Sequence, residues 1–253
     1  MKITVLGGCG AWPAAGQACS GYLLDQDGFL LLVDPGYATL PRLLELVPAE
    51  RVDAVAVTHK HPDHCADLNP LLRARALRDD PAPALPVYTQ PGALDAVLAL
   101  DRPGMLDEAY DLREFSAGAA FEVGPFAVET MLLPHYVPNA GLRISADGAT
   151  VTYTGDTGPS PLVAELAAGS DVLIADSSYA EEVPEDSAAY LTSARQAAVQ
   201  ATDAGVGRLV LTHLVPETDP TEALRAASDG FDGPIDVARP GLVLDVSGKD
   251  QPG

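Results

Sequence analysis

The sequence of 253 residues has little positive charge. Lysine and arginine together number 15 against 36 aspartates and glutamates, the formal net charge is −21, and only three residues are lysine. A broad basic surface that follows the phosphates of a long nucleic acid is hard to build from so few cations, although a local basic patch stays open. The acidity itself is typical of a soluble surface. We therefore expect a small-molecule substrate and no long nucleic acid.

Cysteines and long apolar runs are also scarce. The three cysteines, Cys9, Cys19 and Cys65, form no CxxC pair, which argues against a disulfide framework or a cysteine zinc site and favours a cytoplasmic protein. No apolar run reaches the ~18–20 residues of a spanning helix, so no membrane partner is expected. The opening MKITVLGGCG is typical of a strand and not of a signal peptide. Hydrophobic residues still make up 47% of the chain, which is enough for a core.

Apolar strands and helical segments alternate in both halves of the chain. Strands are expected at 2–6, 20–25, 29–33, 54–57, 87–89, 126–133, 142–145, 149–153, 172–175, 208–211, 235–237 and 242–246, and helices at 40–47, 68–77, 92–100, 162–167 and 193–204. Two sets of strands, each covered by helices, predict an α/β protein built as a four-layer αββα sandwich. Because no linker separates the halves, we expect a single domain at 1–247 and a frayed C-terminal tail at 248–253.

Three of the five histidines lie in one short motif, HKHPDH at 59–64, directly after the strand expected at 54–57. Neutral imidazoles and carboxylates are the ligands of zinc and similar ions. A loop at the end of a strand lets its alternate side chains converge on neighbouring points. In a chain so poor in histidine, this cluster of His59, His61, Asp63 and His64 favours a metal site over a polar solvated loop.

The other two histidines, His135 and His213, also follow expected strands, and Asp156 follows a third in the segment TGDTG. Taken alone, a histidine at a strand end is more often a capping or core residue. Taken together, all five histidines stand at strand ends, where loops from one sheet edge can meet. The set therefore indicates one metal-dependent site.

The order HxHxDH, His, GD and TH resembles that of the metallo-β-lactamase-fold hydrolases. Within them it is similar to the ribonuclease Z branch and the related small cyclic-nucleotide phosphodiesterases of bacteria. The resemblance covers nearly the whole chain and includes LGGCG at 6–10, SGYL at 20–23, LVDPG at 32–36, GLRI at 141–144, YTGDT at 153–157 and LVLTH at 209–213.

This resemblance implies two divalent metal ions. The first ion would take His59, His61 and His135, the second would take Asp63, His64 and His213, and Asp156 would bridge both. Zinc is the default for such ligands, and manganese or iron would also fit them. The implied nucleophile is a hydroxide held by the two ions, with Asp63 as the catalytic residue that orients it or accepts a proton.

The chain departs from ribonuclease Z in one motif. Where that family carries a histidine in an HxT motif, supported by an acidic residue that matches Asp176, this chain has Tyr190. A tyrosine can donate a hydrogen bond to a developing oxyanion, but it is a poor general acid near neutral pH because its pKa is ~10. Tyr190 is thus a candidate catalytic residue or a packing residue. Asp176 and Arg143 are candidates for the substrate site, with a structural ion pair as the other interpretation of Arg143.

These observations favour a metal-dependent phosphodiesterase that acts on a small substrate such as a cyclic nucleotide. The chain lacks the long lysine- and glycine-rich insertion with which ribonuclease Z holds transfer RNA, so transfer-RNA 3′ processing is the weaker alternative. Hydrolysis of a carboxylic ester, lactone or thioester is the main alternative, because Tyr190 replaces the family histidine. A binding module without activity is disfavoured by the complete ligand set. The resemblance also makes a homodimer an expected state.

Overall fold

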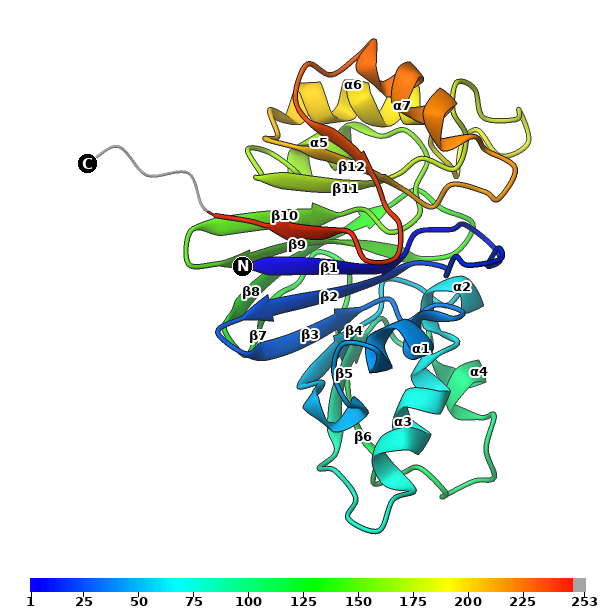
Figure 1. Ribbon diagram of the computed structural model, residues 1–253, viewed down its shortest axis with the longest axis vertical. Helices are drawn as coiled ribbons and strands as arrows, with labels where there is room; N and C mark the ends of the chain where they lie inside the picture. Colours follow the sequence, from blue (N-terminus) through cyan, green and yellow to red (C-terminus); the bar gives the residue numbers. More distant parts are fainter. Residues whose placement is uncertain (248–253) are drawn as a thin grey trace.

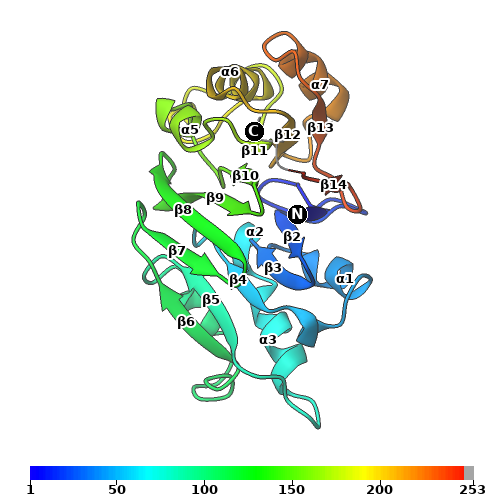
Figure 2. The ribbon, with the colours of Figure 1, turned by 90° about the vertical axis from the view of Figure 1, so that its left-hand side faces the viewer.

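The computed structural model describes residues 1–247, so the tail expected at 248–253 lies outside the described residues. Two seven-stranded sheets lie face to face, and helices cover the outer face of each (Figures 1 and 2). This arrangement confirms the predicted four-layer αββα sandwich.

The bounds of the elements are as follows. The first sheet contains β1 (Lys2–Gly7), β2 (Gly21–Gln26), β3 (Phe29–Val33), β4 (Ala54–Ala56), β5 (Leu85–Thr89), β6 (Tyr110–Glu114) and β14 (Val243–Asp245). The second contains β7 (Ala120–Val123), β8 (Phe126–Leu133), β9 (Asn139–Ala146), β10 (Ala149–Tyr153), β11 (Val172–Asp176), β12 (Leu209–Thr212) and β13 (Ile235–Val237). The helical segments are α1 (Thr39–Leu44), the 3₁₀ turn η1 (Ala49–Arg51), α2 (Pro62–Cys65), α3 (Leu68–Ala76), α4 (Asp95–Leu98), α5 (Pro161–Leu166), α6 (Ala194–Ala204) and α7 (Pro220–Ser228).

The order of the strands brings several carboxyl ends to one edge. The first sheet runs β14-β1-β2-β3-β4-β5-β6 and the second runs β13-β12-β11-β10-β9-β8-β7. Strands β3 to β6 are parallel, and so are β10 to β13. Strand β8 shares the direction of β10, because both are antiparallel to β9. The segments after β4, β8, β10 and β12 therefore leave their sheets at carboxyl ends, where open sheets of this kind bind ligands.

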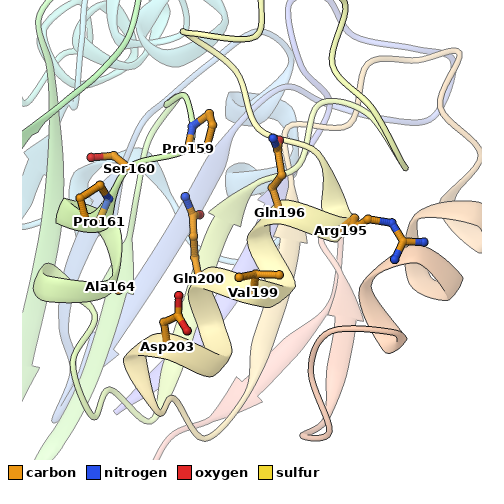
Figure 3. Close-up of a pocket in the computed structure, with 9 residues that line it drawn as sticks. All are labelled: Pro159, Ser160, Pro161, Ala164, Arg195, Gln196, Val199, Gln200 and Asp203. Atoms are coloured by element: carbon orange, nitrogen blue, oxygen red, sulfur yellow. The ribbon is translucent and has the colours of Figure 1, made fainter.

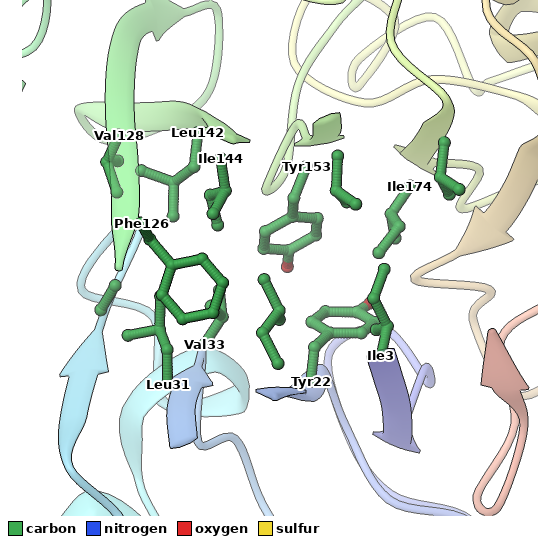
Figure 4. Packing of buried hydrophobic residues seen from close by; sticks show 14 of the residues in the cluster. Ile3, Tyr22, Leu31, Val33, Phe126, Val128, Leu142, Ile144, Tyr153 and Ile174 are labelled. Atoms are coloured by element: carbon green, nitrogen blue, oxygen red, sulfur yellow. The ribbon is translucent and has the colours of Figure 1, made fainter. Parts of the chain in front are cut away.

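The core between the sheets draws on both halves of the chain. Figure 4 shows Tyr22, Phe126 and Tyr153 among the aliphatic side chains that fill this layer. The rings of Tyr22 and Tyr153 lie 4.8 Å apart. Each buried phenol finds a polar partner, since Tyr22 Oη lies 2.5 Å from Thr212 Oγ1 and Tyr153 Oη donates to Asp34. The apolar layer thus ends in polar contacts at the carboxyl ends of β10 and β12, where Tyr153 and Thr212 lie.

Several elements differ from the sequence-based expectation. The strands β6 and β7 were not predicted, because few of their residues are buried and charged residues interrupt the apolar run that would mark a buried strand. The helix expected at 92–100 is shorter, Asp95–Leu98. The helix α7 was missed although its start is readable in the sequence, since Asp219 caps it through a hydrogen bond from Thr221 N and Pro220 occupies its first position.

Candidate metal centre

The structure brings all seven predicted metal ligands together. They form two sets, and within each set one ligand atom of every residue lies within 4.8 Å of the others: His59, His61, His135 and Asp156, and then Asp63, His64, Asp156 and His213. Asp156 belongs to both sets. The first sheet contributes the motif that follows β4, and the second contributes the residues that follow β8, β10 and β12.

Local backbone geometry places these side chains. His61 precedes α2, and Pro62 at the first helical position has a backbone preset for the helical turn that carries Asp63 and His64. Gly36 packs so closely on this turn that a Cβ there would lie 1.8 Å from the carbonyl oxygen of Asp63. His213 has a φ of 60°, a conformation that costs energy for a residue other than glycine. The surrounding structure holds this strain at the metal-ligand cluster.

The carboxylate of Asp156 lies at the centre of the cluster. Its Oδ1 is 3.1 Å from His64 Nε2, and its Oδ2 is 3.1 Å from His213 Nε2. The same Oδ2 lies 3.6 Å from His135 Nε2 and 3.7 Å from His59 Nε2. One carboxylate is therefore within reach of both ligand sets, as a bridging ligand must be.

Two buried atoms test whether a cation fits here. His64 Nε2 and Asp156 Oδ1 are buried and have no hydrogen-bond partner within residues 1–247, although they face each other at 3.1 Å. Buried polar atoms without partners are rare and need an explanation such as a bound ion. The donors of the cluster are five imidazoles and two carboxylates, a mixed set that suits zinc, manganese or iron. The residues present therefore fit divalent metal ions.

Asp34 holds the buried imidazole of His64 from behind. Its carboxylate accepts hydrogen bonds from His64 Nδ1 at 2.8 Å, from Tyr153 Oη at 2.9 Å, and from the backbone N and Oγ1 of Thr58. Thr58 Oγ1 in turn lies 3.0 Å from His59 Nδ1 and accepts its proton, since its own hydroxyl proton goes to Asp34. Both histidines thereby present Nε2 to the cluster. In the sequence, Asp34 stands in the motif LVDPG at 32–36, which alone assigns it no role.

Two further contacts fix the remaining buried rings. His213 Nδ1 lies 2.9 Å from Ser178 Oγ, whose own proton is donated to Asp176 Oδ1 at 2.8 Å. His135 Nδ1 donates to the backbone carbonyl oxygen of Tyr190 at 3.0 Å. Contacts of this outer kind set the tautomer and orientation of a ligating histidine. They leave the Nε2 atoms of both rings free to bind metal.

Electrostatics divide the histidines into two groups. Burial lowers the pKa of His59, His61 and His135 below the usual value, so these rings are neutral and ready to ligate. Burial acts the same way on His213, but the charges of Asp156 and neighbouring carboxylates outweigh it and raise the pKa of that ring to about 9. Burial alone would raise the pKa of Asp156, yet His213 and His64 hold it well below its usual value. Divalent cations that bind at this centre would replace protons on imidazoles.

Replacement of Asp34 by Asn is expected to weaken metal binding roughly 10–100-fold, the usual cost of removing an outer-shell partner of a ligating histidine. The carboxylate is lost while the size of the side chain is kept, so His64 loses its anchor without a cavity. Competition with a chromophoric chelator measures the dissociation constant. Asp25→Asn, on the partly exposed end of β2, is the matched control. An unchanged affinity in Asp34→Asn would contradict the role assigned to this carboxylate.

Asp176 lies behind the metal ligands and not in an open substrate site. Its side chain is fully buried and accepts hydrogen bonds from Thr157 N and from the backbone N and Oγ of Ser178. Burial raises the pKa of this carboxyl to about 7. Because Ser178 connects it to His213, Asp176 is a positioning residue. The expectation that it binds substrate is corrected by this burial.

Arg143 is directed away from the cluster. Its guanidinium donates to the carbonyl oxygens of Leu166 and Ala168 and to Ser170 Oγ, all at 3.0 Å, and so holds the end of α5. Its neighbours Leu142 and Ile144 face the core between the sheets, which leaves Arg143 on the helix-covered face of β9. The expectation that it meets an anionic substrate is corrected, and its contacts are with two backbone carbonyls and a serine hydroxyl rather than with an acidic partner.

Tyr190 reaches the centre through its backbone. Its carbonyl oxygen holds His135, while its ring is half exposed and lies 4.5 Å from the ring of Tyr136.

A surface groove of about 560 Å³ lies between α5 and α6, away from the cluster. Figure 3 shows it with Pro161, Gln196 and Gln200 on its walls, and none of its lining residues is a metal ligand. In the part of the chain that the structure describes, every helix is too short or too polar to cross a membrane.

Comparison with known proteins agrees with this geometry. The family model of the β-lactamase superfamily domain matches residues 30–214. The probable metallo-hydrolase YhfI of Bacillus subtilis is 32% identical, over 96% of this chain and 99% of its own length. Its crystal structure superposes with a TM-score of 0.88 over 96% of this chain and 99% of that one, at 31% identity.

A second relative carries a more specific name. The ribonuclease Z of Mycobacterium bovis is 33% identical over 94% of this chain and 95% of its own length. The human short-form tRNase Z, at 21% identity with a TM-score of 0.78 over 98% of this chain and 100% of that one, shows the shared fold alone. The family match spans most of the chain and contains all seven residues of the two ligand sets. This chain belongs to the β-lactamase superfamily and is a metallo-hydrolase of the metallo-β-lactamase fold.

Proposed function

We propose that this metallo-hydrolase binds two divalent metal ions, most simply zinc, and hydrolyses a small phosphodiester such as a cyclic nucleotide. The observation that carries the proposal is the pair of ligand sets that share Asp156. Since both sheets supply ligands, residues 1–247 would act as one domain. Asp63, His64 and His213 would hold one ion, and His59, His61 and His135 the other.

When bound, two such ions polarise the phosphoryl group and lower the pKa of water toward ~7. The residues of the chain do the rest. Asp63 is anchored by a hydrogen bond of 2.8 Å from the backbone N–H of Ala11, and its Oδ2 lies 3.2 Å from His213 Nε2. Burial opposes ionisation of this carboxyl, but His64 and His213 hold its pKa below the usual value. Asp63 is thus a fixed, ionised carboxylate whose oxygen can accept a hydrogen bond from the attacking water and orient it.

The choice of a small phosphodiester rests on two supports, one for the bond that is cleaved and one for the size of the substrate. A relative at 33% identity is named ribonuclease Z, and a ribonuclease cleaves phosphodiester bonds. The choice of a small substrate rests on the charge of −21 and the three lysines, which leave little cationic surface for a long RNA. The first support concerns the type of bond and the second concerns the size of the substrate. Neither depends on which base or sugar flanks the phosphate.

Hydrolysis of bis(p-nitrophenyl) phosphate and of a simple lactone, measured side by side with zinc or manganese, tests the proposal. We expect phosphodiester turnover that depends on added metal, with two ions per chain by metal analysis. Lactone turnover without phosphodiester turnover would overturn the proposed substrate class and favour the carboxylic-ester alternative. A chain that holds two ions and then cleaves only a transfer-RNA precursor would overturn the proposed substrate size.

A further inference from the structure

Two tyrosine rings stand directly beside the metal ligand His135. Tyr136 follows it in the sequence, and its ring centroid lies 5.2 Å from the imidazole. Tyr190 supplies the carbonyl oxygen that holds His135 Nδ1, and its ring lies 4.5 Å from that of Tyr136 at an interplanar angle of 35°. Segments 54 residues apart in the chain therefore place one aromatic pair at the edge of the metal centre.

This pair is exposed rather than packed into a core. Tyr136 is 49% and Tyr190 38% exposed, in a chain with only 6% aromatic residues. The surface continues into a hollow of about 440 Å³ whose walls include Pro134, Tyr136 and Leu162. Exposed apolar surface that is contiguous and adjoins a site marks a place where something binds.

We propose that Tyr136 and Tyr190 form a stacking platform for a planar ring of the substrate, so that the phosphodiester carries a nucleobase that lies on these tyrosines while its phosphate meets the metal centre. The inference rests on the proposed function, because it assumes that the phosphate binds among the seven ligands. Stacking on aromatic rings holds any base, since every base has a π-face. It needs no cationic groove, which agrees with the low number of lysines and arginines.

The geometry favours a ring over an alkyl chain as the occupant. The two tyrosine rings stack on one another, with centroids 4.5 Å apart and a tilt of 35°, so a planar ring of the substrate would extend this stack on an outer face. The Tyr136 ring lies 5.2 Å from the His135 ring, so a base resting on Tyr136 would lie next to a phosphate bound at the metal centre. An acyl chain would gain from apolar area alone and would not distinguish an aromatic wall from an aliphatic one.

Binding of two ligands that differ only by the base tests this platform. Adenosine 5′-monophosphate and ribose 5-phosphate are titrated calorimetrically into the zinc-loaded protein. We expect Tyr136→Ala to weaken binding of the nucleotide by roughly tenfold, within the range found when a stacking aromatic is removed, and to leave ribose 5-phosphate unchanged. Tyr136→Phe should retain the nucleotide affinity, and Tyr136→Leu, which keeps apolar bulk but no π-face, should behave like Tyr136→Ala.

Three results would overturn the platform. Equal weakening of both ligands would mean that Tyr136 only supports His135. Unchanged nucleotide affinity in Tyr136→Ala would show that no base rests on this ring. A loss seen instead in Tyr37→Ala, an exposed tyrosine elsewhere on the surface, would move the base to a different wall.

A further assay keeps this inference separate from the proposed function. Competition with a chromophoric chelator measures the zinc affinity, which reports the metal centre with no ring on the ligand. Tyr136→Ala should bind zinc with the wild-type affinity and keep the wild-type circular dichroism spectrum, which shows that the variant is folded. If the wild-type protein cleaves no phosphodiester but still prefers the nucleotide through Tyr136, the proposed reaction is wrong and the platform stands.

Discussion

Asp156→Ala is expected to abolish hydrolysis and to reduce the number of bound divalent ions in the same variant. The carboxylate lies 3.1 Å from the Nε2 atoms of both His64 and His213, and it belongs to both ligand sets. Its loss therefore affects two ions at once. The fall in kcat/KM should exceed the roughly 10–100-fold cost of removing an outer-shell partner. Turnover of bis(p-nitrophenyl) phosphate and metal content per chain are the two measurements.

The loss of the negative charge of Asp156 is also expected to weaken metal binding. Without Asp156, two cations in the site would repel each other with less compensation. This loss outweighs the easier deprotonation of His64 and His213, whose protonated forms the Asp156 carboxylate stabilises. Asp203→Ala removes a carboxylate that is exposed on α6 and is the matched control. A variant Asp156→Ala that retains two ions and near-normal turnover would show that the two sets are not bridged.

The metal ligands could be predicted from the sequence because metal chemistry restricts residue type. Histidines and aspartates that each follow an apolar strand are recognisable without knowing which strands are neighbours. The resemblance then divided them into two sets, and the geometry of His59, Asp63 and Asp156 agrees with that division.

The supports behind these ligands could not be predicted in the same way. Asp34 lies 30 residues from the histidine that it holds. Ser178 lies 35 residues from His213. The support of His135 is a backbone carbonyl, which leaves no mark in the sequence because every residue has one. Such contacts depend on strand neighbours, and only the topology of the sheets defines these.

Arg143 shows an error that local periodicity could have prevented. Its closeness in sequence to His135 made it a candidate for the substrate site, but successive side chains of a strand point to opposite faces. Leu142 and Ile144 face the core between the sheets, so Arg143 must face the covering helices. The alternation in GLRI already contained this answer. The short strands β6 and β7 are the reverse case, since few of their residues are buried and charged residues interrupt their apolar runs, which leaves too weak a periodic signal.

Removal of the metal ions by a chelator is expected to lower the melting temperature without unfolding the protein at room temperature. The hydrophobic core clusters contain no metal ligand. Their apolar side chains therefore stay buried whether or not metal is bound. The imidazoles of His64 and His213 also find carboxylate partners in Asp63 and Asp156. These buried charges are paired and do not force the chain open.

The size of the shift follows from linkage. At a free zinc concentration 100 times the dissociation constant, binding of one ion to the native state alone adds about 2.7 kcal/mol, and two ions add about twice that. For a chain of 150–250 residues, each kcal/mol changes the melting temperature by about 2–4 °C, so removal of both ions should lower it by roughly 10–20 °C. Thermal unfolding followed by circular dichroism, with and without zinc, measures this. Asp156→Ala should respond much less. An equal response in that variant would place the stabilising zinc elsewhere on this acidic surface, because a site deprived of its central carboxylate cannot yield the same linkage energy.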